Sequence, residues 1–191
     1  GMEYRETVDR SNHIFLNQLE LTHNYLKERA IAAFEYHTQL IDANIDGGVA
    51  EFDAIANAFS IELGTLLANS EKLLQTTHER LLEKIFMVRV RSEDQDSLHT
   101  EMCEKDFVRA CRVSAEEESE VWSNELKKLE KALSNHRAEK RCKMLAEYRE
   151  SHSPSEFGST EKERRSILFR TEQPRLTPVD ETDSEWREPA N

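Results

Sequence analysis

Glycine and proline are scarce in this chain, which holds 5 glycines and 4 prolines among its 191 residues. Because these residues supply most tight turns and helix ends, their shortage predicts few and long helices. All 4 prolines follow Ser151, in a segment rich in Ser, Thr and Glu that is typical of disorder. We therefore predict an all-α protein in three parts: a tag remnant and flexible N-terminus at residues 1–8, a helical bundle or coiled-coil domain at 9–150, and a disordered acidic tail at 151–191.

Cysteine is also scarce, and the sequence has neither a long apolar run nor a net positive charge. The 3 cysteines have no zinc-ribbon spacing, and no apolar signal segment accompanies them, so we expect a cytoplasmic protein with reduced thiols. No apolar run approaches the ~20 residues that cross a bilayer. The net charge of -12 argues against nucleic acid as the main partner, because phosphate binding depends on clustered Lys and Arg.

Enzyme signatures are missing from the sequence as well. We find no glycine-rich phosphate loop and no nucleophile elbow, and the pair His78-Glu79 lacks the second histidine of a metalloprotease helix. His99 and Cys103 lie four residues apart, with Cys111 two turns further along. A surface imidazole beside a small buried thiol explains this pattern better than a metal site does. We expect no catalytic residue, no cofactor and no metal.

Amphipathic periodicity is what the chain does contain. Residues 52–88 carry an apolar stripe wider than the seam of a two-stranded coiled coil, which favours a bundle of three or more helices. We expect this second helix to begin near Val49 and a third helix to cover 97–150, with a kink or a loop at 114–120. The polar stretch 91–97 predicts a break or hinge between them, and the alternative is a continuous solvated helix. The apolar positions that we assign to helix faces include Leu16, Phe34, Phe52, Phe59, Leu63, Leu73, Phe86, Leu98, Met102, Phe107, Val121 and Trp122.

The first helix is expected to begin at Asp9 or Ser11, either of which can cap it, and to end before Gly47-Gly48. Glycine there would close the helix in the left-handed conformation. So short a connection makes the two helices antiparallel, with partners whose residue numbers sum to roughly 95, so that Phe34 would face Ile61. The stripe on the second helix exceeds what one helix can cover. Either the third helix folds back or a second chain completes the bundle, and we favour a homo- or hetero-oligomer.

Lysine and arginine gather in one stretch of the expected third helix, namely Lys127, Lys128, Lys131, Arg137, Lys140, Arg141 and Lys143. Glutamates interleave with them, which favours a solvated helix face over a binding surface. The alternative function is a membrane-surface module of the curved helical dimer type that binds anionic lipids. The net charge counts against it.

The predicted tail contains one amphipathic turn at residues 160–170, which begins with the Thr-x-x-Glu spacing of a capping box. Its adjacent bulky apolar residues are Ile167, Leu168 and Phe169. A tail has no core in which to bury them, so the motif at 164–170 either docks on a partner or folds back onto the bundle. The candidate regulatory phosphosites are Ser153, Ser166 and Thr177.

The arrangement of long helices, uneven charge and a motif-bearing tail is similar to that of eukaryotic cytoskeletal, axonemal and vesicle-tethering coiled-coil proteins. This is a similarity of pattern over residues 9–150 without a diagnostic motif. It implies a non-enzymatic scaffold or subunit of a larger intracellular assembly, associated with the cytoskeleton. Such a protein would bind partner helices through the bundle and a second protein partner through the tail.

Overall fold

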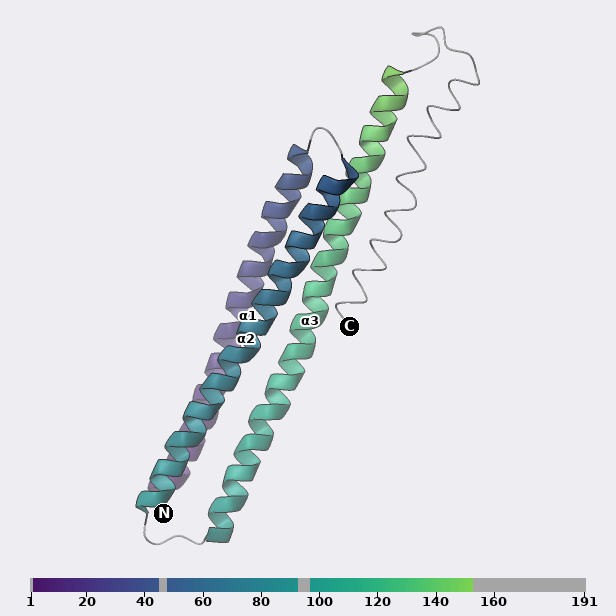
Figure 1. Cartoon of the computed structure of the whole chain (residues 1–191). Coiled ribbons are helices and arrows are strands. Elements are labelled where there is room, and N and C mark those ends of the chain that lie inside the picture. The colour runs from purple at the N-terminus through teal and green to yellow at the C-terminus, as the bar shows by residue number, and fades with distance from the viewer. Residues whose placement is uncertain (1, 45–47, 93–96, 153–191) are drawn as a thin grey trace. The chain divides into compact units, whose positions relative to one another are not determined.

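Three helices make up the part of the chain that the computed structural model describes, which is residues 2–44, 48–92 and 97–152. They are α1 (Met2–Ala43), α2 (Val49–Arg91) and α3 (Ser97–Ser151), as Figure 1 shows. The all-α class, the start of the second helix and the separation of the second helix from the third are confirmed. α3 continues through residues 114–120, so a loop there is wrong.

The three helices contribute to two compact units. Unit 1 consists of Gly1–Ala30 and Leu63–Leu126, and unit 2 of Ile31–Glu62 and Lys127–Asn191. Within each unit a segment of α3 packs against segments of both α1 and α2. The third helix therefore folds back onto the other two within each unit.

The first helix begins at Met2, earlier than the expected caps Asp9 and Ser11, which is a correction. In unit 1 the cause is Tyr4, whose side chain is buried and whose hydroxyl donates to the carbonyl of Thr100 in α3 at 2.9 Å. Burial raises the pKa of Tyr4 to about 12. This tertiary contact extends the helix beyond its local start signals.

The buried face of α1 follows an eleven-residue pattern in which intervals of four, four and three residues repeat. Its members are Ser11, Phe15, Leu19, Thr22, Leu26, Ala30, Ala33, His37 and Ile41. Such a repeat averages about 3.67 residues per turn, close to the 3.6 of an α-helix, so the buried positions stay on one face. Several members are polar, which weakens the hydrophobic pattern in the sequence.

In unit 2 the contact between α1 and α2 is aromatic, but one of its expected residue pairs is absent. The rings of Phe34 and Phe59 lie 6.2 Å apart, and His37 lies 5.1 Å from the same Phe59 ring. Phe59 is fully buried, whereas Ile61, the expected partner of Phe34, is 70% exposed. The expected pairing of Phe34 with Ile61 is therefore wrong, although the residue numbers of the two ring pairs sum to 93 and 96, close to the expected sum of roughly 95.

Several apolar residues that the sequence assigns to helix faces are exposed, which is a second correction. They are Leu16, Leu73, Phe86, Leu98, Met102 and Val121. Where two adjacent residues are apolar, one points into the bundle and the other outward, since neighbours on a helix are about 100° apart. Ile85 is buried, for example, while Phe86 lies outside beneath the guanidinium of Arg89 at 5.0 Å.

Gly48 lies immediately before α2 rather than closing α1. Its carbonyl accepts the amide of Phe52 at 3.1 Å, and its backbone does not adopt the left-handed conformation. At the end of α1 the amide of Asn44 donates to the carbonyl of Ile41 at 3.2 Å, which forms a tight final turn. Gly47 lies outside the described residues. The expected left-handed role of glycine is therefore wrong at Gly48.

Candidate functional site

A groove of about 420 Å³ lies in unit 1 between α2 and α3. Its apolar lining comes from all three helices and includes Phe15, Leu74, Val108, Cys111 and Ala115. This volume falls in the range of ligand sites, and the groove opens to solvent along one side. It is the candidate functional site because it combines an apolar interior with polar and charged groups.

Small residues on α3 explain the groove. Between the buried positions Cys111 and Trp122, the inward positions one and two turns along are Ala115 and Ser119. Neither is long enough to fill the space against α2. The weak hydrophobic pattern at 114–120 therefore marks an unfilled part of the bundle rather than an interruption of the helix.

His78 is one of the residues that line this groove. Its ring stacks on Phe107 with centroids 5.7 Å apart and meets the ring of Phe15 edge-on at 6.2 Å. Nε2 is buried and has no hydrogen-bond partner within the described ranges. Burial lowers the pKa of His78, which favours the neutral ring. A neutral imidazole can donate through one nitrogen and accept through the other.

The cysteines and His99 take separate positions. Burial raises the pKa of the Cys111 thiol to about 11, so this thiol stays protonated and unreactive at neutral pH. The Sγ atom of Cys103 lies 3.6 Å from Nε2 of His99 in an exposed part of α3. In the described part of the chain, no group of three His, Cys, Asp or Glu residues is arranged to hold a metal ion.

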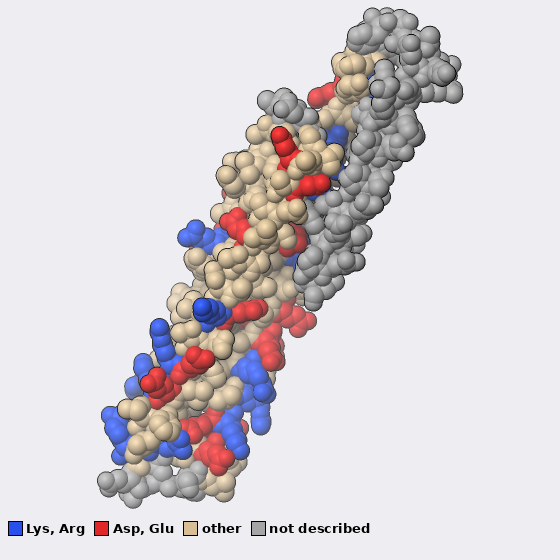
Figure 2. Space-filling model, viewed as in Figure 1, with Lys and Arg blue, Asp and Glu red and all other residues tan. Residues whose placement is uncertain are grey.

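Charged groups border the groove. Glu71 and Glu116 line it together with one cation, Arg112. The hydroxyl of Ser119 donates to the carboxylate of Glu71 at 2.7 Å, which links α3 to α2 beside the groove. Elsewhere on the face of unit 1 in the lower part of Figure 2, acidic and basic side chains intermix. The border of the groove is acidic on balance.

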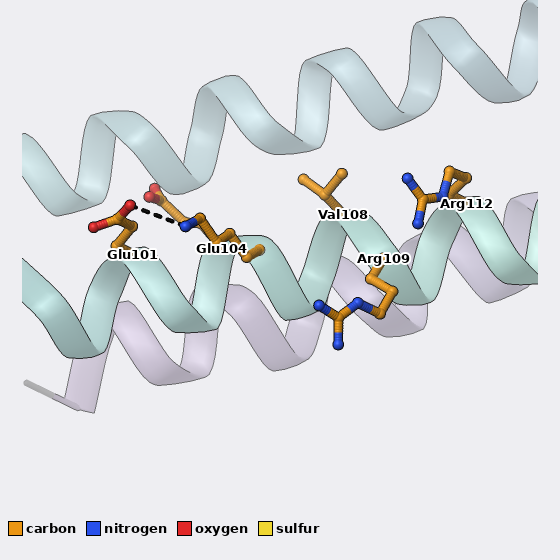
Figure 3. A pocket seen from close by; sticks show the side chains of 6 residues that line it. Glu101, Glu104, Val108, Arg109 and Arg112 are labelled. Atoms are coloured by element: carbon orange, nitrogen blue, oxygen red, sulfur yellow. Dashed lines mark ion pairs between the residues drawn. The ribbon is translucent and has the colours of Figure 1, made fainter.

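A second hollow, of about 370 Å³, lies nearer the N-terminal end of α3 and shares Val108 and Arg112 with the groove. Figure 3 shows Glu101 toward one end and Arg112 toward the other, with Val108 pointing toward the neighbouring helix. Lys105 is paired with Glu101 at 3.1 Å. Charges of both signs therefore lie side by side here.

The basic stretch of α3 packs in unit 2, where two of its arginines are buried. Arg137 is 1% exposed and lies 3.2 Å from the carboxylate of Asp53, and Arg141 lies 3.6 Å from the same carboxylate. The Arg141 guanidinium also lies over the ring of Phe52 at 5.3 Å. A solvated helix face is therefore wrong for these two arginines. They act as packing residues that join α3 to α2.

Further pairs tie this stretch to α1 within unit 2. Nε2 of His136 lies 2.6 Å from the carboxylate of Asp42, and the ammonium of Lys140 donates to the Asp42 carbonyl at 3.3 Å. These exposed contacts use basic groups of α3 to link it to α1. Some of the interleaved charges in the sequence thus form contacts between helices.

The candidate residues of the tail lie outside the described residues. They are Ile167, Leu168 and Phe169 of the docking motif and the candidate phosphosites Ser153, Ser166 and Thr177. Sequence reasoning missed His78 as a groove residue, because only its incomplete metalloprotease pattern was considered. Its place four residues after Leu74 and three before Leu81, on the buried face of α2, was the available signal.

No family model matches the chain, and neither a curated protein nor a solved structure gives a match. None of the described helices is long and apolar enough to cross a membrane. The functional argument therefore rests on the surfaces and the groove of the protein itself.

Proposed function

We propose that this protein is a non-enzymatic helical scaffold, a subunit of a larger cytoplasmic assembly associated with the cytoskeleton. It binds a partner helix through an outer face of the bundle and a second protein partner through the tail motif at 164–170. One observation carries the proposal: α1 has a second apolar stripe on its outer side in unit 1.

The outer stripe consists of Ile14, Leu21 and Tyr25, which are 39%, 63% and 50% exposed. Their spacing of seven and four residues, with Gln18 at the position between, is that of a coiled-coil seam. At 100° per residue the outer stripe lies about 100° around α1 from the buried face. α1 can therefore pack in the core through one face and bind a partner helix through the other.

A partner helix would gain from covering the outer stripe. Burial of each bulky apolar side chain contributes about 1.5–3 kcal/mol before the cost of association is subtracted. The polar Gln18, whose amide donates to the hydroxyl of Thr22 at 3.1 Å, would restrict the register of such a pair. Binding of this kind needs no catalytic residue and no cofactor.

The tail completes the proposed scaffold through its apolar residues Ile167, Leu168 and Phe169. Phosphorylation of Ser166, between this cluster and two arginines, would change the charge of the motif and regulate its binding. Ser153 and Thr177, each followed by proline, are further candidate sites.

Two variants with the same chemical change test the outer stripe. Leu21→Glu places a carboxylate on the stripe, and Leu16→Glu places one at a residue that is 51% exposed on the opposite side of α1 in the same unit. We expect Leu21→Glu to reduce self-association in light scattering, or capture of the cognate partner in a quantitative pull-down, by about tenfold or more. Leu16→Glu should behave as the wild type does, with unchanged helicity for both.

Equal behaviour of the two variants would contradict the proposal. Sedimentation with anionic liposomes at low and moderate salt tests the membrane-surface alternative, since binding to anionic headgroups weakens as salt screens it. Salt-sensitive sedimentation of the wild type and of both variants would favour that alternative over the scaffold.

A further inference from the structure

We propose that the contact between His23 of α1 and Trp122 of α3 in unit 1 is a pH-sensitive switch, in which protonation of His23 exchanges its partner Trp122 for the carboxylate of Glu118. The proposal concerns the packing of unit 1 and does not depend on the proposed scaffold function. It follows from the position of a single atom, Nδ1 of His23, which lies within reach of both a buried donor and a carboxylate.

The neutral form of His23 accepts a hydrogen bond from Trp122. The indole Nε1 of Trp122 donates to Nδ1 of His23 at 2.8 Å, and the two rings stack with centroids 6.5 Å apart. An indole N–H can only donate, so Nδ1 must keep its lone pair, as it does in the neutral ring that carries its proton on Nε2. Trp122 is 1% exposed, so its N–H group depends on an acceptor within the protein.

Protonation of His23 reverses the role of the same nitrogen. Both ring nitrogens of an imidazolium are donors, so Nδ1 no longer accepts from Trp122. The carboxylate of Glu118 lies 3.6 Å from Nδ1 and can accept its proton. A charged donor and a carboxylate form a stronger hydrogen bond than two neutral groups do. The protonated ring therefore pairs with Glu118, and the buried N–H of Trp122 loses its acceptor, which is unfavourable.

The exposure of the three side chains suits this exchange. The side chains of His23 and Glu118 are each 36% exposed, so protons from water reach the pair, whereas Trp122 is buried. Glu118 and Trp122 lie four residues apart on α3, which places them on the same side of that helix. Histidine changes its charge between about pH 5 and 8. The switch therefore responds to acidification below neutral pH.

Other charged groups near His23 do not replace Glu118 as its partner. On α1, Glu20 lies three residues before His23 and Lys27 four residues after it, so charges of both signs flank the ring on its own helix. From α2, Glu71 reaches α3 and accepts a hydrogen bond there instead. Within the described helices, the carboxylate of Glu118 is the one charged group that pairs with His23.

The test follows the indole N–H signal of Trp122 by NMR in the ¹⁵N-labelled full-length chain. The chain has 2 tryptophans, so Trp186→Phe leaves Trp122 as the only source of this signal. We expect one transition of the signal between pH 7.5 and pH 5. In the acid form the indole proton should exchange with water about fivefold faster or more, after correction for the intrinsic pH dependence of exchange. A signal that stays unchanged over this range would overturn the proposal.

Matched substitutions on α1 identify the group that titrates. His23→Gln keeps an oxygen that can accept from Trp122 but does not change its charge, so this variant should lose the transition. His13→Gln makes the same change at an exposed histidine of the same helix and should keep it. Circular dichroism checks that both variants remain helical. Persistence of the transition in His23→Gln would overturn the proposal.

Matched substitutions on α3 test the exchange of partners, and they keep the test valid if His23→Gln disturbs folding. Glu118→Gln removes the carboxylate that stabilises the protonated ring, so the midpoint of the Trp122 transition should move to lower pH by about 0.2–0.7 unit. Glu117→Gln makes the same change at the exposed neighbouring residue and should move the midpoint less. Equal midpoints for these two variants would overturn the assignment of Glu118 as the second partner.

Discussion

Substitution of Phe59 by alanine measures how firmly unit 2 depends on its aromatic contact. Phe59 is fully buried, and its ring contacts both Phe34 at 6.2 Å and His37 at 5.1 Å. Removing a fully packed phenylalanine costs about 3–5 kcal/mol, because the apolar transfer free energy is lost and a cavity remains. We therefore expect Phe59→Ala to lower the free energy of unfolding by that amount.

Equilibrium urea unfolding followed by circular dichroism measures this loss. With a slope of about 2 kcal/mol per molar urea, the midpoint should fall by about 1.5–2.5 M. Ile61→Ala is the control, because Ile61 lies two residues further along α2 and is 70% exposed. It should change the free energy of unfolding by no more than about 0.5 kcal/mol.

A double-mutant cycle with Phe34→Ala then isolates the contact between the two rings. We expect a coupling free energy of about 0.5–1.5 kcal/mol between Phe34 and Phe59. Equal effects of Phe59→Ala and Ile61→Ala, or additive effects of the two phenylalanine substitutions, would refute the register described for unit 2.

Two further predictions concern unit 1. The folded pKa of His78 lies below its ordinary value of 6.5, so the unfolded chain binds more protons and stability falls as pH drops below about 6.5. His78→Gln should reduce this loss between about pH 7.5 and pH 5 in pH-dependent urea unfolding, and an unchanged slope would count against the burial of His78. Burial raises the pKa of Glu130, which gives the opposite dependence, but both proteins share that contribution. The indole of Trp122, which is 1% exposed, donates to Nδ1 of His23 at 2.8 Å. His23→Ala should therefore cost about 1–3 kcal/mol by leaving the buried donor unpaired, whereas the same change at the exposed His13 should cost little; similar unfolding midpoints would refute this role for His23.

The sequence determined the helices themselves. Scarce glycine and proline, together with a continuous apolar stripe, were sufficient to predict the all-α class and the start of α2 at Val49. They also predicted an α3 that begins at Ser97. Helix formation depends on local periodicity and on breakers, and both are visible in a single chain. The buried positions of Phe52, Phe59 and Trp122 were likewise predicted from the apolar stripes, whereas Phe86 on the same stripe is exposed.

Only the tertiary structure decided which residue of each apolar pair lies inside. Leu74 is buried and Leu73 is exposed, although the sequence treats them alike. Periodicity defines a face of a helix, but the partner helices define which part of that face is covered. The same reason explains the buried Arg137, whose position on the core-facing side of α3 is acceptable because Asp53 of α2 lies 3.2 Å away.

The groove depends on tertiary structure for a related reason. Small residues such as Ala115 leave space only where α2 lies across from α3, as at Ser119, which bonds to Glu71, and no pattern within α3 reveals which residues of α2 lie there. The early start of α1 likewise depends on α3, because the Tyr4 hydroxyl donates to the carbonyl of Thr100. The sequence thus determines where the helices form and roughly which side of each helix is buried. Register, the choice of buried neighbour and unfilled volume arise when one helix meets another, because they depend on pairs of residues far apart in the chain.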